Sequence, residues 1–372
     1  MEGMPLYVGL MSGTSLDGVD ACLASFPDSG PREHSHTHMA FPEDLRERLL
    51  ALARGHAELT SVADADAQVA DTYALAVNRL LEQSATAAEG VRAIGSHGQT
   101  VLHRPHGPAP TSIQIGDPHR IAVATGIDTV ADFRRADIAA GGEGAPLAPA
   151  FHAAVFSDPR ETRTVVNLGG IANVTLLRPG EPVIGFDTGP ANILLDAWIT
   201  RHCDQPKDTN GAWSAAGRVD ADLLEQMQAD PWFERPPPKS TGRERFDLSW
   251  VDACVAATGR AIEAIDVQAT LAELTAATIA DALASLGHSP ERLLVCGGGA
   301  YNVDLLQRLG TRLPTARVES TAAHGMDPQH VEAMAFAWLA ARRVAGLAGN
   351  LPSVTGATRA VVLGTLIQAQ PR

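Results

Sequence analysis

The stretch Y7-VGLMSGTSLDGVDACL-23 places a short polar segment, SGTSLDG, between two apolar runs. Apolar runs of this length on either side of Gly, Ser, Thr and Asp predict two strands joined by a turn. Backbone N–H groups in such a turn are free to point outward, and this geometry can bind an anion. The sequence therefore raises the question of whether this first hairpin holds a phosphate group.

The stretch TVVNLGGIANVTLL at 164–177 repeats the same order of apolar run, small polar turn and apolar run. Each copy is followed by further strand and then by a helical pattern, which predicts an internal duplication of a βββα-type lobe. The 372 residues also exceed the size that one hydrophobic core usually serves. We therefore predict an α/β protein with two similar lobes and a cleft between them, the first at 1–133 plus about 355–372 and the second, with helical insertions, at 134–354.

Helical patterns are found in both halves of the chain. A stretch from about Glu58 to Ala88 keeps apolar residues on one side, namely Val62, Val69, Tyr73, Val77 and Leu80. The second half is mostly helical, with helices expected near 190–203, 218–229, 248–265, 268–286 and 331–345.

The composition excludes several classes of protein. A formal charge of −14 would repel nucleic acid. No apolar stretch reaches the roughly 18 residues that span a bilayer, and the N-terminal residues lack the pattern of a signal peptide, so we expect a cytoplasmic protein with no membrane partner. The four cysteines are far apart and show no metal-ligand spacing, so we expect reduced thiols: Cys22, Cys203, Cys254 and Cys296.

Histidines alternate in the stretch HSHTHMAF, at His34, His36 and His38. They would share one face of a strand and could bind a metal. No carboxylate or cysteine stands nearby at ligand spacing, so the sequence favours three exposed histidines on an edge strand.

The loop ERPPPKSTGRERF at 234–246 is rich in cations for an acidic protein, among them Lys239, Arg243 and Arg245. Such a loop could face an anionic ligand. A plain surface loop explains it equally well.

Three glycine-rich turns follow predicted strands: GTSLDG, NLGGIAN and CGGGAYN. Singly, each could be a tight turn, a bulge or a point of close packing. Three of them at strand ends of a duplicated α/β chain favour an ATP site, with two hairpins for the phosphates and a third turn for the nucleoside. The chain has no GxxxxGK[ST] P-loop and no GxGxxG fingerprint, so the site is of another kind.

Further candidate residues lie on loops and turns. In GFDTGPANILLDAW (185–198), Asp187 follows a strand that is predicted to end at Phe186, a position where α/β proteins keep reactive groups. The alternative is that Asp187 caps the next helix. GSHGQTVLHRP and ADFRRADIAAGGEGAPLAP supply donors and acceptors that suit either a sugar or another polar interface: Ser96, His97, Gln99, Arg134, Asp137 and Glu143.

Taken together and in order, these motifs resemble the anhydro-N-acetylmuramic acid kinase family, a bacterial branch of the sugar kinase, Hsc70 and actin superfamily. The resemblance runs nearly end to end, through GLMSGTSLDGVD, GSHGQT, ADFRRADIAAGG, GAPLAPAFH, NLGGIANVT, GFDTGPAN, KSTGRERF, CGGGAYN and EAMAFAWLA. It implies two duplicated actin-like (ribonuclease H-like) lobes around a central nucleotide and substrate cleft.

The resemblance also implies roles for residues. Asp187 would be the catalytic base, and the sugar would be held by Ser96, His97, Gln99, Arg134 and Glu332. ATP would be bound by the three glycine-rich turns, through Gly13, Thr14, Ser15, Leu16, Asp17, Gly18, Val19, Asp20, Asn167, Gly169, Gly170, Asn173, Gly297, Gly298 and Gly299. The residues that contact Mg²⁺ stay unassigned, because Met11 stands where the superfamily usually has an Asp.

The reaction implied is the ATP-dependent opening of 1,6-anhydro-N-acetylmuramic acid with phosphorylation of O6, a step in cell-wall recycling. The family further suggests a homodimer. Two alternatives are another sugar or acetate-type kinase of the superfamily, and a non-catalytic sugar-sensing protein on the same fold.

Overall fold

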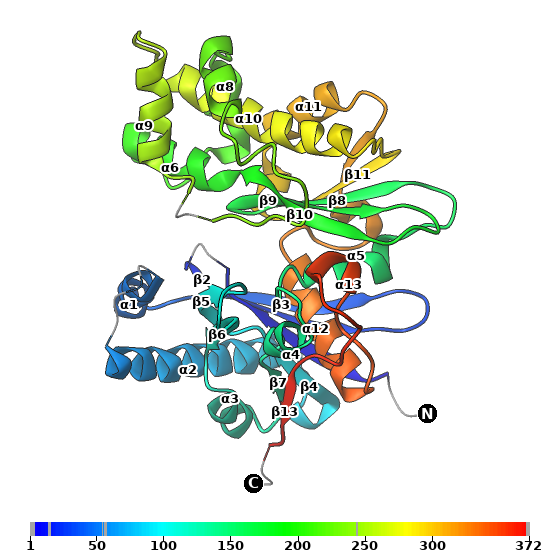
Figure 1. Ribbon diagram of the computed structural model, residues 1–372. Coiled ribbons are helices and arrows are strands. Elements are labelled where there is room, and N and C mark those ends of the chain that lie inside the picture. The colour runs from blue at the N-terminus through cyan, green and yellow to red at the C-terminus, as the bar shows by residue number, and fades with distance from the viewer. Residues whose placement is uncertain (1–3, 14–15, 54, 56–57, 243–244, 370–372) are drawn as a thin grey trace. The chain divides into compact units, whose positions relative to one another are not determined.

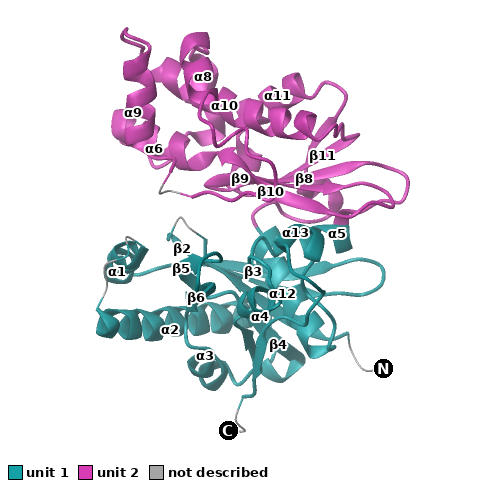
Figure 2. Cartoon of the chain, in the orientation of Figure 1, with its two compact units in different colours: residues 1–155, 330–372 teal, residues 156–329 magenta. Residues whose placement is uncertain are grey.

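The computed structural model describes residues 4–13, 16–53, 55, 58–242 and 245–369. By its internal contacts the chain divides into two compact units, residues 1–155 with 330–372 (unit 1) and residues 156–329 (unit 2) (Figure 2). Residues 134–155 and 330–354, which the sequence analysis assigned to the second lobe, thus group with unit 1. No helix among the described residues is long and apolar enough to cross a membrane.

Unit 1 is built on a six-stranded sheet in the order β13-β7-β4-β1-β2-β3 (Figure 1). The first three strands form an antiparallel meander, and β4 and β7 continue the sheet on the other side of β1 in parallel. The strands are β1 (Leu6–Met11), β2 (Gly18–Ser25), β3 (Arg32–Ala40), β4 (Val91–Ser96), β7 (Thr129–Ala131) and β13 (Thr365–Ile367), and β5 (Gln99–Arg104) pairs separately with β6 (Thr111–Ile115).

Unit 2 repeats this topology in a five-stranded sheet in the order β10-β9-β8-β11-β12. Its first three strands are again an antiparallel meander, and β11 and β12 again add in parallel to the first strand. The predicted duplication of an actin-like α/β lobe is therefore confirmed. The strands are β8 (Arg163–Leu168), β9 (Ile171–Leu177), β10 (Ile184–Pro190), β11 (Arg292–Cys296) and β12 (Arg317–Ser320).

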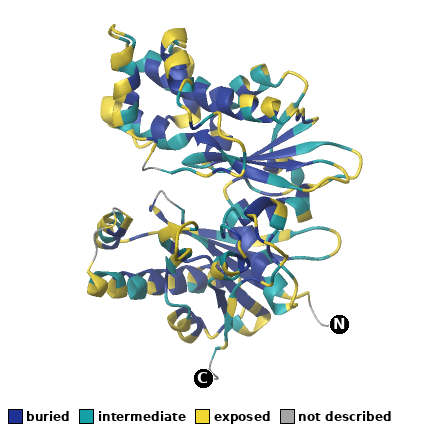
Figure 3. Ribbon diagram, in the orientation of Figure 1, coloured by how far each residue is buried: buried dark blue, intermediate teal, exposed yellow. Residues whose placement is uncertain are grey.

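Helices cover the sheets, and the buried residues of each unit follow the faces where helix and sheet meet (Figure 3). In unit 1 they are α1 (Glu43–Ala53), α2 (Leu59–Gln83), α3 (Pro118–Thr125), α4 (Arg135–Ala139), α5 (Ala148–Phe156), α12 (Val331–Val344) and α13 (Pro352–Thr355). In unit 2 they are α6 (Asn192–Cys203), α7 (Ala212–Ala216), α8 (Ala221–Gln228), α9 (Leu248–Ala257), α10 (Ala264–Ser285) and α11 (Val303–Arg312).

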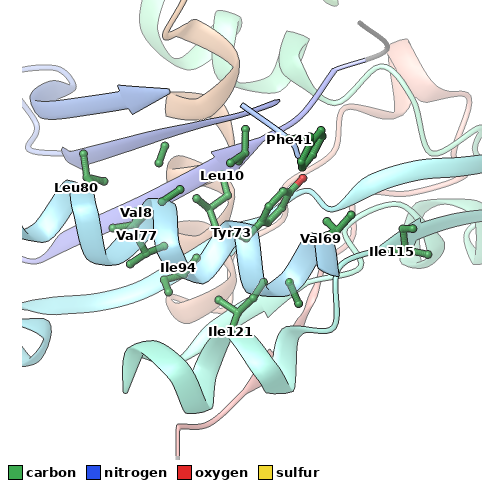
Figure 4. Packing of buried hydrophobic residues seen from close by; sticks show 14 of the residues in the cluster. Val8, Leu10, Phe41, Val69, Tyr73, Val77, Leu80, Ile94, Ile115 and Ile121 are labelled. Atoms are coloured by element: carbon green, nitrogen blue, oxygen red, sulfur yellow. The ribbon is translucent and has the colours of Figure 1, made fainter. Parts of the chain in front are cut away.

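Helix α2 forms because apolar residues recur every three or four positions. Val69, Tyr73, Val77 and Leu80 are fully buried, as the pattern predicts. They pack with Val8 and Leu10 of β1 and with Ile94 of β4 (Figure 4). This cluster is the core on one face of the unit 1 sheet.

The opposite face of that sheet is covered by α12, which packs directly against the backbone of two strands. Successive residues of a strand point to opposite faces, so Gly9 lies between Val8 and Leu10 but faces α12. Gly9 pairs in register with Gly95 of β4. A Cβ would lie 1.8 Å from the Ala333 carbonyl oxygen at Gly9 and 2.1 Å from the Phe336 carbonyl oxygen at Gly95. Helix α12 can therefore lie this close only on a pair of glycines.

We predict that Gly95→Ala destabilises the protein strongly, because the new methyl group would overlap backbone rather than a flexible side chain. The expected loss in the free energy of unfolding is about 3 kcal/mol, at the upper end of the cost of overpacking. Urea unfolding of the two proteins measures it.

Gly310→Ala is the matched control, because Gly310 lies inside α11 and a Cβ there meets nothing within 4 Å. Alanine is preferred to glycine inside a helix by about 1 kcal/mol, so this variant should be at least as stable as the parent. Equal stability of Gly95→Ala and the parent would contradict the packing of α12 described here.

Candidate active site

The first glycine-rich hairpin joins β1 to β2, as predicted, and Met11 pairs with Asp20 at its base. Thr14 and Ser15 lie outside the described residues. The side chains of Leu16 and Val19 belong to the core that α2 covers. Gly18 is needed for packing, because a Cβ there would lie 2.3 Å from the carbonyl oxygen of Met39 on β3. Contacts of Leu16, Gly18 or Val19 with a ligand could therefore come only from the backbone.

Asp20 is the charged group at the base of this hairpin, and its carboxylate is held by two histidines of β3. Its Oδ1 lies 3.0 Å from His38 Nδ1 and 3.4 Å from His36 Nε2. Burial raises the pKa of Asp20, but the hydrogen bonds from His36 and His38 outweigh it and lower the pKa to about 2. The carboxylate is thus ionised at neutral pH.

The sequence analysis missed this pairing because the carboxylate partner comes from the neighbouring strand. His34, the third histidine, lies instead with its Nε2 2.8 Å from Ser25 Oγ. Among the described residues, no group of three or more His, Cys, Asp or Glu side chains is arranged to hold a metal ion. In the described residues, the three histidines therefore do not form the metal site that the sequence left open as one of two interpretations.

The candidate sugar residues of unit 1 meet where β4 ends. Arg134 Nη2 donates to His97 Nε2 at 2.8 Å, and Arg134 Nη1 donates to the Gly144 carbonyl oxygen at 2.8 Å. Burial lowers the pKa of Arg134 to about 10, while the negative charges of Glu332 and Asp137 act in the opposite direction. The structure thus brings His97, Arg134 and Glu332 into one electrostatic group.

His97 is a neutral imidazole with a defined tautomer. Burial, followed by the charge of Arg134, holds the pKa of His97 well below its usual range, although the backbone of Ser12 and Gly98 favours the protonated form. A guanidinium has only donors, so Nε2 must be the acceptor and the ring proton is on Nδ1. The ring packs against Phe336 of α12, with the two centroids 4.6 Å apart.

Two polar atoms beside His97 are buried without a hydrogen-bond partner among the described residues: Ser96 Oγ and Gln99 Oε1. An unpaired buried polar group costs roughly 1–3 kcal/mol, so such groups are uncommon in folded proteins. A ligand with hydroxyl and amide groups would satisfy both atoms. A sugar offers the hydroxyl groups, and an N-acetyl substituent adds the amide.

Asp137 follows the DFRR segment and supports the loop that carries Arg134 rather than a ligand. It is fully buried, and its Oδ2 accepts from Gly144 N while its Oδ1 accepts from Asn350 Nδ2 and Thr355 Oγ1. Because Gly144 also accepts from Arg134, Asp137 fixes the partner that orients the arginine. Glu143 lies outside this group, with its Oε1 3.4 Å from His106 Nε2.

In unit 2 the second hairpin and the third glycine-rich turn pack directly on one another. Gly297 has φ +79°, and a Cβ there would lie 2.3 Å from Asn167 Oδ1, while a Cβ at Gly299 would lie 2.6 Å from Leu168 Cβ. Asn167 pairs in register with Asn173 across the hairpin. The structure thus places together seven predicted nucleotide residues: Asn167, Gly169, Gly170, Asn173, Gly297, Gly298 and Gly299.

Asn167 Oδ1 is buried and has no hydrogen-bond partner among the described residues. The N-terminus of α6, in contrast, is already satisfied by the hairpin, because the Gly170 carbonyl accepts from Ala191 N and Ile193 N and the Gly169 carbonyl accepts from Asn192 N. The polar atoms that remain for a ligand in this part of unit 2 are therefore side-chain and glycine backbone groups, not the helix end.

Asp187 lies within β10, which continues to Pro190, so the reading of this residue as a helix cap is wrong. Helix α6 begins at Asn192 and has no side-chain cap at Ala191. The β9–β10 pairing shifts register between Asp187 and Gly189. The half-buried Asp187 carboxylate accepts from Thr241 N at 3.0 Å through Oδ2, and Asp187 N donates to the Lys239 carbonyl oxygen at 3.1 Å.

The cationic loop therefore contacts β10 at Lys239 and Thr241, and two of its cations have partners inside the protein. Lys239 Nζ donates to the Phe233 carbonyl oxygen at 2.8 Å and lies 4.6 Å from the centre of the Trp232 ring. Arg245 pairs with Asp230. Arg243 lies outside the described residues. Neither Lys239 nor Arg245 is the unpaired surface cation that an anion-facing loop would need.

We predict that the pair formed by His38 and Asp20 makes stability depend on pH. The hydrogen bond to Asp20 raises the pKa of His38 against the effect of burial, so the contribution of His38 is complete below about pH 6.5 and is lost as the pH rises through the folded-state pKa. Asp20 loses its contribution only as the pH falls toward 2. His38→Gln should therefore lower the urea midpoint more at about pH 5.5 than at about pH 9.

His119→Gln serves as the control, because His119 is exposed and no carboxylate is hydrogen-bonded to its ring among the described residues. The midpoint of this variant should differ from the parent by the same small amount at both pH values. An effect of His38→Gln that is equal at both pH values would contradict the pairing.

Comparison with known proteins gives a family match over nearly the whole chain. The family model for anhydro-N-acetylmuramic acid kinase matches residues 5–369. The anhydro-N-acetylmuramic acid kinase of Xanthomonas axonopodis pv. citri is 54% identical over 371 residues, which cover 98% of each chain. That of Xylella fastidiosa is 50% identical over 368 residues, which cover 97% of this chain and 96% of the relative.

A solved structure, the activator of the 2-hydroxyisocaproyl-CoA dehydratase from Clostridium difficile, is 11% identical and covers 89% of this chain and 92% of its own, with a TM-score of 0.47. The strand order and direction in the two units define the fold.

Proposed function

The chain belongs to the anhydro-N-acetylmuramic acid kinase family, and on this premise we propose that it transfers the γ-phosphate of ATP to O6 of 1,6-anhydro-N-acetylmuramic acid while water opens the 1,6-anhydro bond. The products are ADP and N-acetylmuramic acid 6-phosphate, so the reaction belongs to the recycling of cell-wall peptidoglycan. The observation that carries the proposal is the match of the family model over residues 5–369. A cytoplasmic location and a homodimer stay predictions.

The substrate determines the chemistry that the protein must perform. In the anhydro sugar O6 is bonded to C1, so there is no free 6-hydroxyl to phosphorylate. Water attacks C1 and gives a proton to Asp187, the C1–O6 bond breaks, and its electron pair moves to O6. O6 then attacks the γ-phosphorus, and the bond to the bridging oxygen of ADP breaks. Asp187 afterwards releases the proton to solvent.

Asp187 suits the role of general base because its carboxylate is oriented by the protein itself. The Thr241 N–H fixes Oδ2, and the backbone bond from Asp187 N to the Lys239 carbonyl fixes the residue beside the bulge in β10. Positioned general bases are typically worth about 10² to 10⁴ in rate. Because the carboxylate is oriented before the substrate binds, it needs no further ordering in order to act as the base.

The sugar is assigned to the unit 1 residues at the end of β4. The unpaired Ser96 Oγ and Gln99 Oε1, the His97 and Arg134 pair and the carboxylate of Glu332 supply both donors and acceptors. The neutral state of His97 supports this role, because its Nε2 accepts from Arg134 and its Nδ1–H remains as a donor with no partner among the described residues.

ATP is assigned to the first hairpin and to the glycine-rich turns of unit 2. Mg²⁺, when bound with the nucleotide, would neutralise charge on the transferring phosphate. It prefers carboxylate oxygens, and the hairpin offers those of Asp17 and Asp20. Asp17 is exposed where the hairpin returns to β2, and Asp20 lies at the base of the hairpin, so the carboxylates of this hairpin are the groups that would hold the metal.

The experiment that tests the proposed reaction is mass spectrometry of the sugar after incubation with the protein, ATP and Mg²⁺ in ¹⁸O-water. A product that has gained one phosphoryl group and one labelled oxygen at C1 is expected. Consumption of ATP with free sugars but no label at C1 would indicate an ordinary sugar kinase. Sugar binding without any turnover would indicate a sensing protein.

We predict that Asp187→Asn binds ATP and the sugar with near-normal affinity but loses at least about 100-fold in kcat, because the amide cannot accept the proton from water. Asparagine keeps an oxygen that can accept from Thr241 N, so the fold should be retained. Calorimetric titration and a coupled ADP assay measure the two effects.

Asp196→Asn is the matched control. Asp196 is another aspartate of unit 2, on α6, and burial raises its pKa to about 6. It has no role in the proposed reaction, so its amide variant should keep the kcat of the parent. A near-normal kcat for Asp187→Asn would remove Asp187 from the role of base.

A further inference from the structure

Tyr73 and Ser12 form a buried hydrogen bond that the reaction as proposed does not use. The two hydroxyl oxygens are 2.5 Å apart, although the residues are separated by 61 positions in the chain. The exposed fraction is 2% for Ser12 and 0% for Tyr73. Neither hydroxyl can reach water, so each depends on the other for its hydrogen bond.

The surroundings of Tyr73 show why this bond matters. Its neighbours in the core are apolar, and Figure 4 shows the hydroxyl pointing away from α2, past Leu10 toward Phe41. Burial raises the pKa of Tyr73, and the charge of Asp20 acts in the same direction, so the phenol stays protonated at neutral pH. The helix thus presents one fixed hydroxyl to the end of β1.

Ser12 is the hydrogen-bond partner of the Tyr73 hydroxyl. It follows the last residue of β1 and directly precedes Gly13, so it forms the base of the first glycine-rich hairpin. It also lies beside the sugar residues, because His97 N donates to the Leu10 carbonyl oxygen at 3.0 Å and the Ser12 backbone influences the pKa of His97. Ser12 therefore lies at the base of the first hairpin, and its backbone lies beside His97.

We propose that Tyr73 is a positioning residue for this hairpin, and that its bond to Ser12 fixes the described base of the hairpin, Ser12 and Gly13, for the binding of the phosphates of a nucleotide. Tyr73 itself contacts no reacting atom. The buried face of α2 thus fixes Ser12 through a side-chain hydrogen bond, in addition to the apolar core that includes Leu16 and Val19 of the hairpin. The inference rests on the proposed function only in naming ATP as the nucleotide.

A purely structural role for the bond predicts a different outcome. If the bond only stabilised the core, its loss would lower the midpoint of thermal unfolding and leave nucleotide affinity unchanged. If it positions the hairpin, its loss also lowers the fraction of molecules in the binding conformation, which raises the Kd for nucleotide. The two roles therefore differ in the affinity of the folded protein, measured well below its Tm.

The test uses the full chain and a non-hydrolysable ATP analogue with Mg²⁺, titrated calorimetrically against Tyr73→Phe, Ser12→Ala and the double variant. Each single change should raise the Kd by about five- to tenfold, the effect of one net hydrogen bond. The Kd of the double variant should be raised by no more than about tenfold relative to the parent, because both changes remove the same bond. Where turnover is measured, the KM for ATP should rise more than kcat falls.

Thr164→Val is the matched control, because it also removes a buried hydroxyl from a side-chain pair. Thr164 Oγ1 lies 2.7 Å from His288 Nε2, and Thr164 stands near the start of β8, at the end of that strand away from the glycine-rich turn. This variant should lose thermal stability with an unchanged Kd. If Tyr73→Phe does not fold, Ser12→Ala, which removes the partner without touching the core of α2, provides the test.

Each result separates the inference from the proposed function. A parent chain that binds the nucleotide, with Tyr73→Phe and Ser12→Ala binding it equally well, would overturn the positioning role alone. A parent that binds nucleotide but leaves the anhydro sugar unchanged would overturn the proposed reaction, and the affinities of the variants would still decide the role of Tyr73. A parent that binds no nucleotide would overturn both.

Discussion

The close approach of α12 to the sheet of unit 1 is the constraint on which the rest of that unit depends. It requires the two glycines that face the helix from neighbouring strands, Gly9 and Gly95, because any Cβ there would meet the helix backbone. The same helix carries Glu332 in its first turn and Phe336 against the ring of His97. The packing of α12 thus fixes some of the candidate sugar-binding residues as well as the fold.

In unit 2, glycines likewise allow two segments to pack closely. Gly297 and Gly299 let the third turn lie on the second hairpin, and the carbonyls of Gly169 and Gly170 close the N-terminus of α6. These glycines therefore serve the packing of the third turn, the second hairpin and α6 on one another. What remains for a ligand is a small set of buried polar atoms, among them Asn167 Oδ1 in this unit and Ser96 Oγ in unit 1.

The electrostatics of the candidate site follow from partners supplied by distant segments. His97 is neutral because it is buried beside Arg134, and Asp20 stays ionised because His36 and His38 face it from the next strand. The proposed reaction takes a proton from water and moves negative charge onto phosphate, so the protonation states of the surrounding groups must be set in advance. Burial and these contacts set the protonation states of His97 and Asp20 in the protein itself.

The sequence by itself determined what is local: the two hairpins, the buried face of α2, the duplication and the motifs of the family. It could not show that Asp187 lies inside a strand rather than capping a helix, that Lys239 is used inside the protein, or that Tyr73 reaches Ser12. These depend on which strands pair and which helix face meets them. Periodicity records that a residue is buried, whereas only the tertiary structure decides which polar partner it meets, because those partners are tens to hundreds of residues apart in the chain.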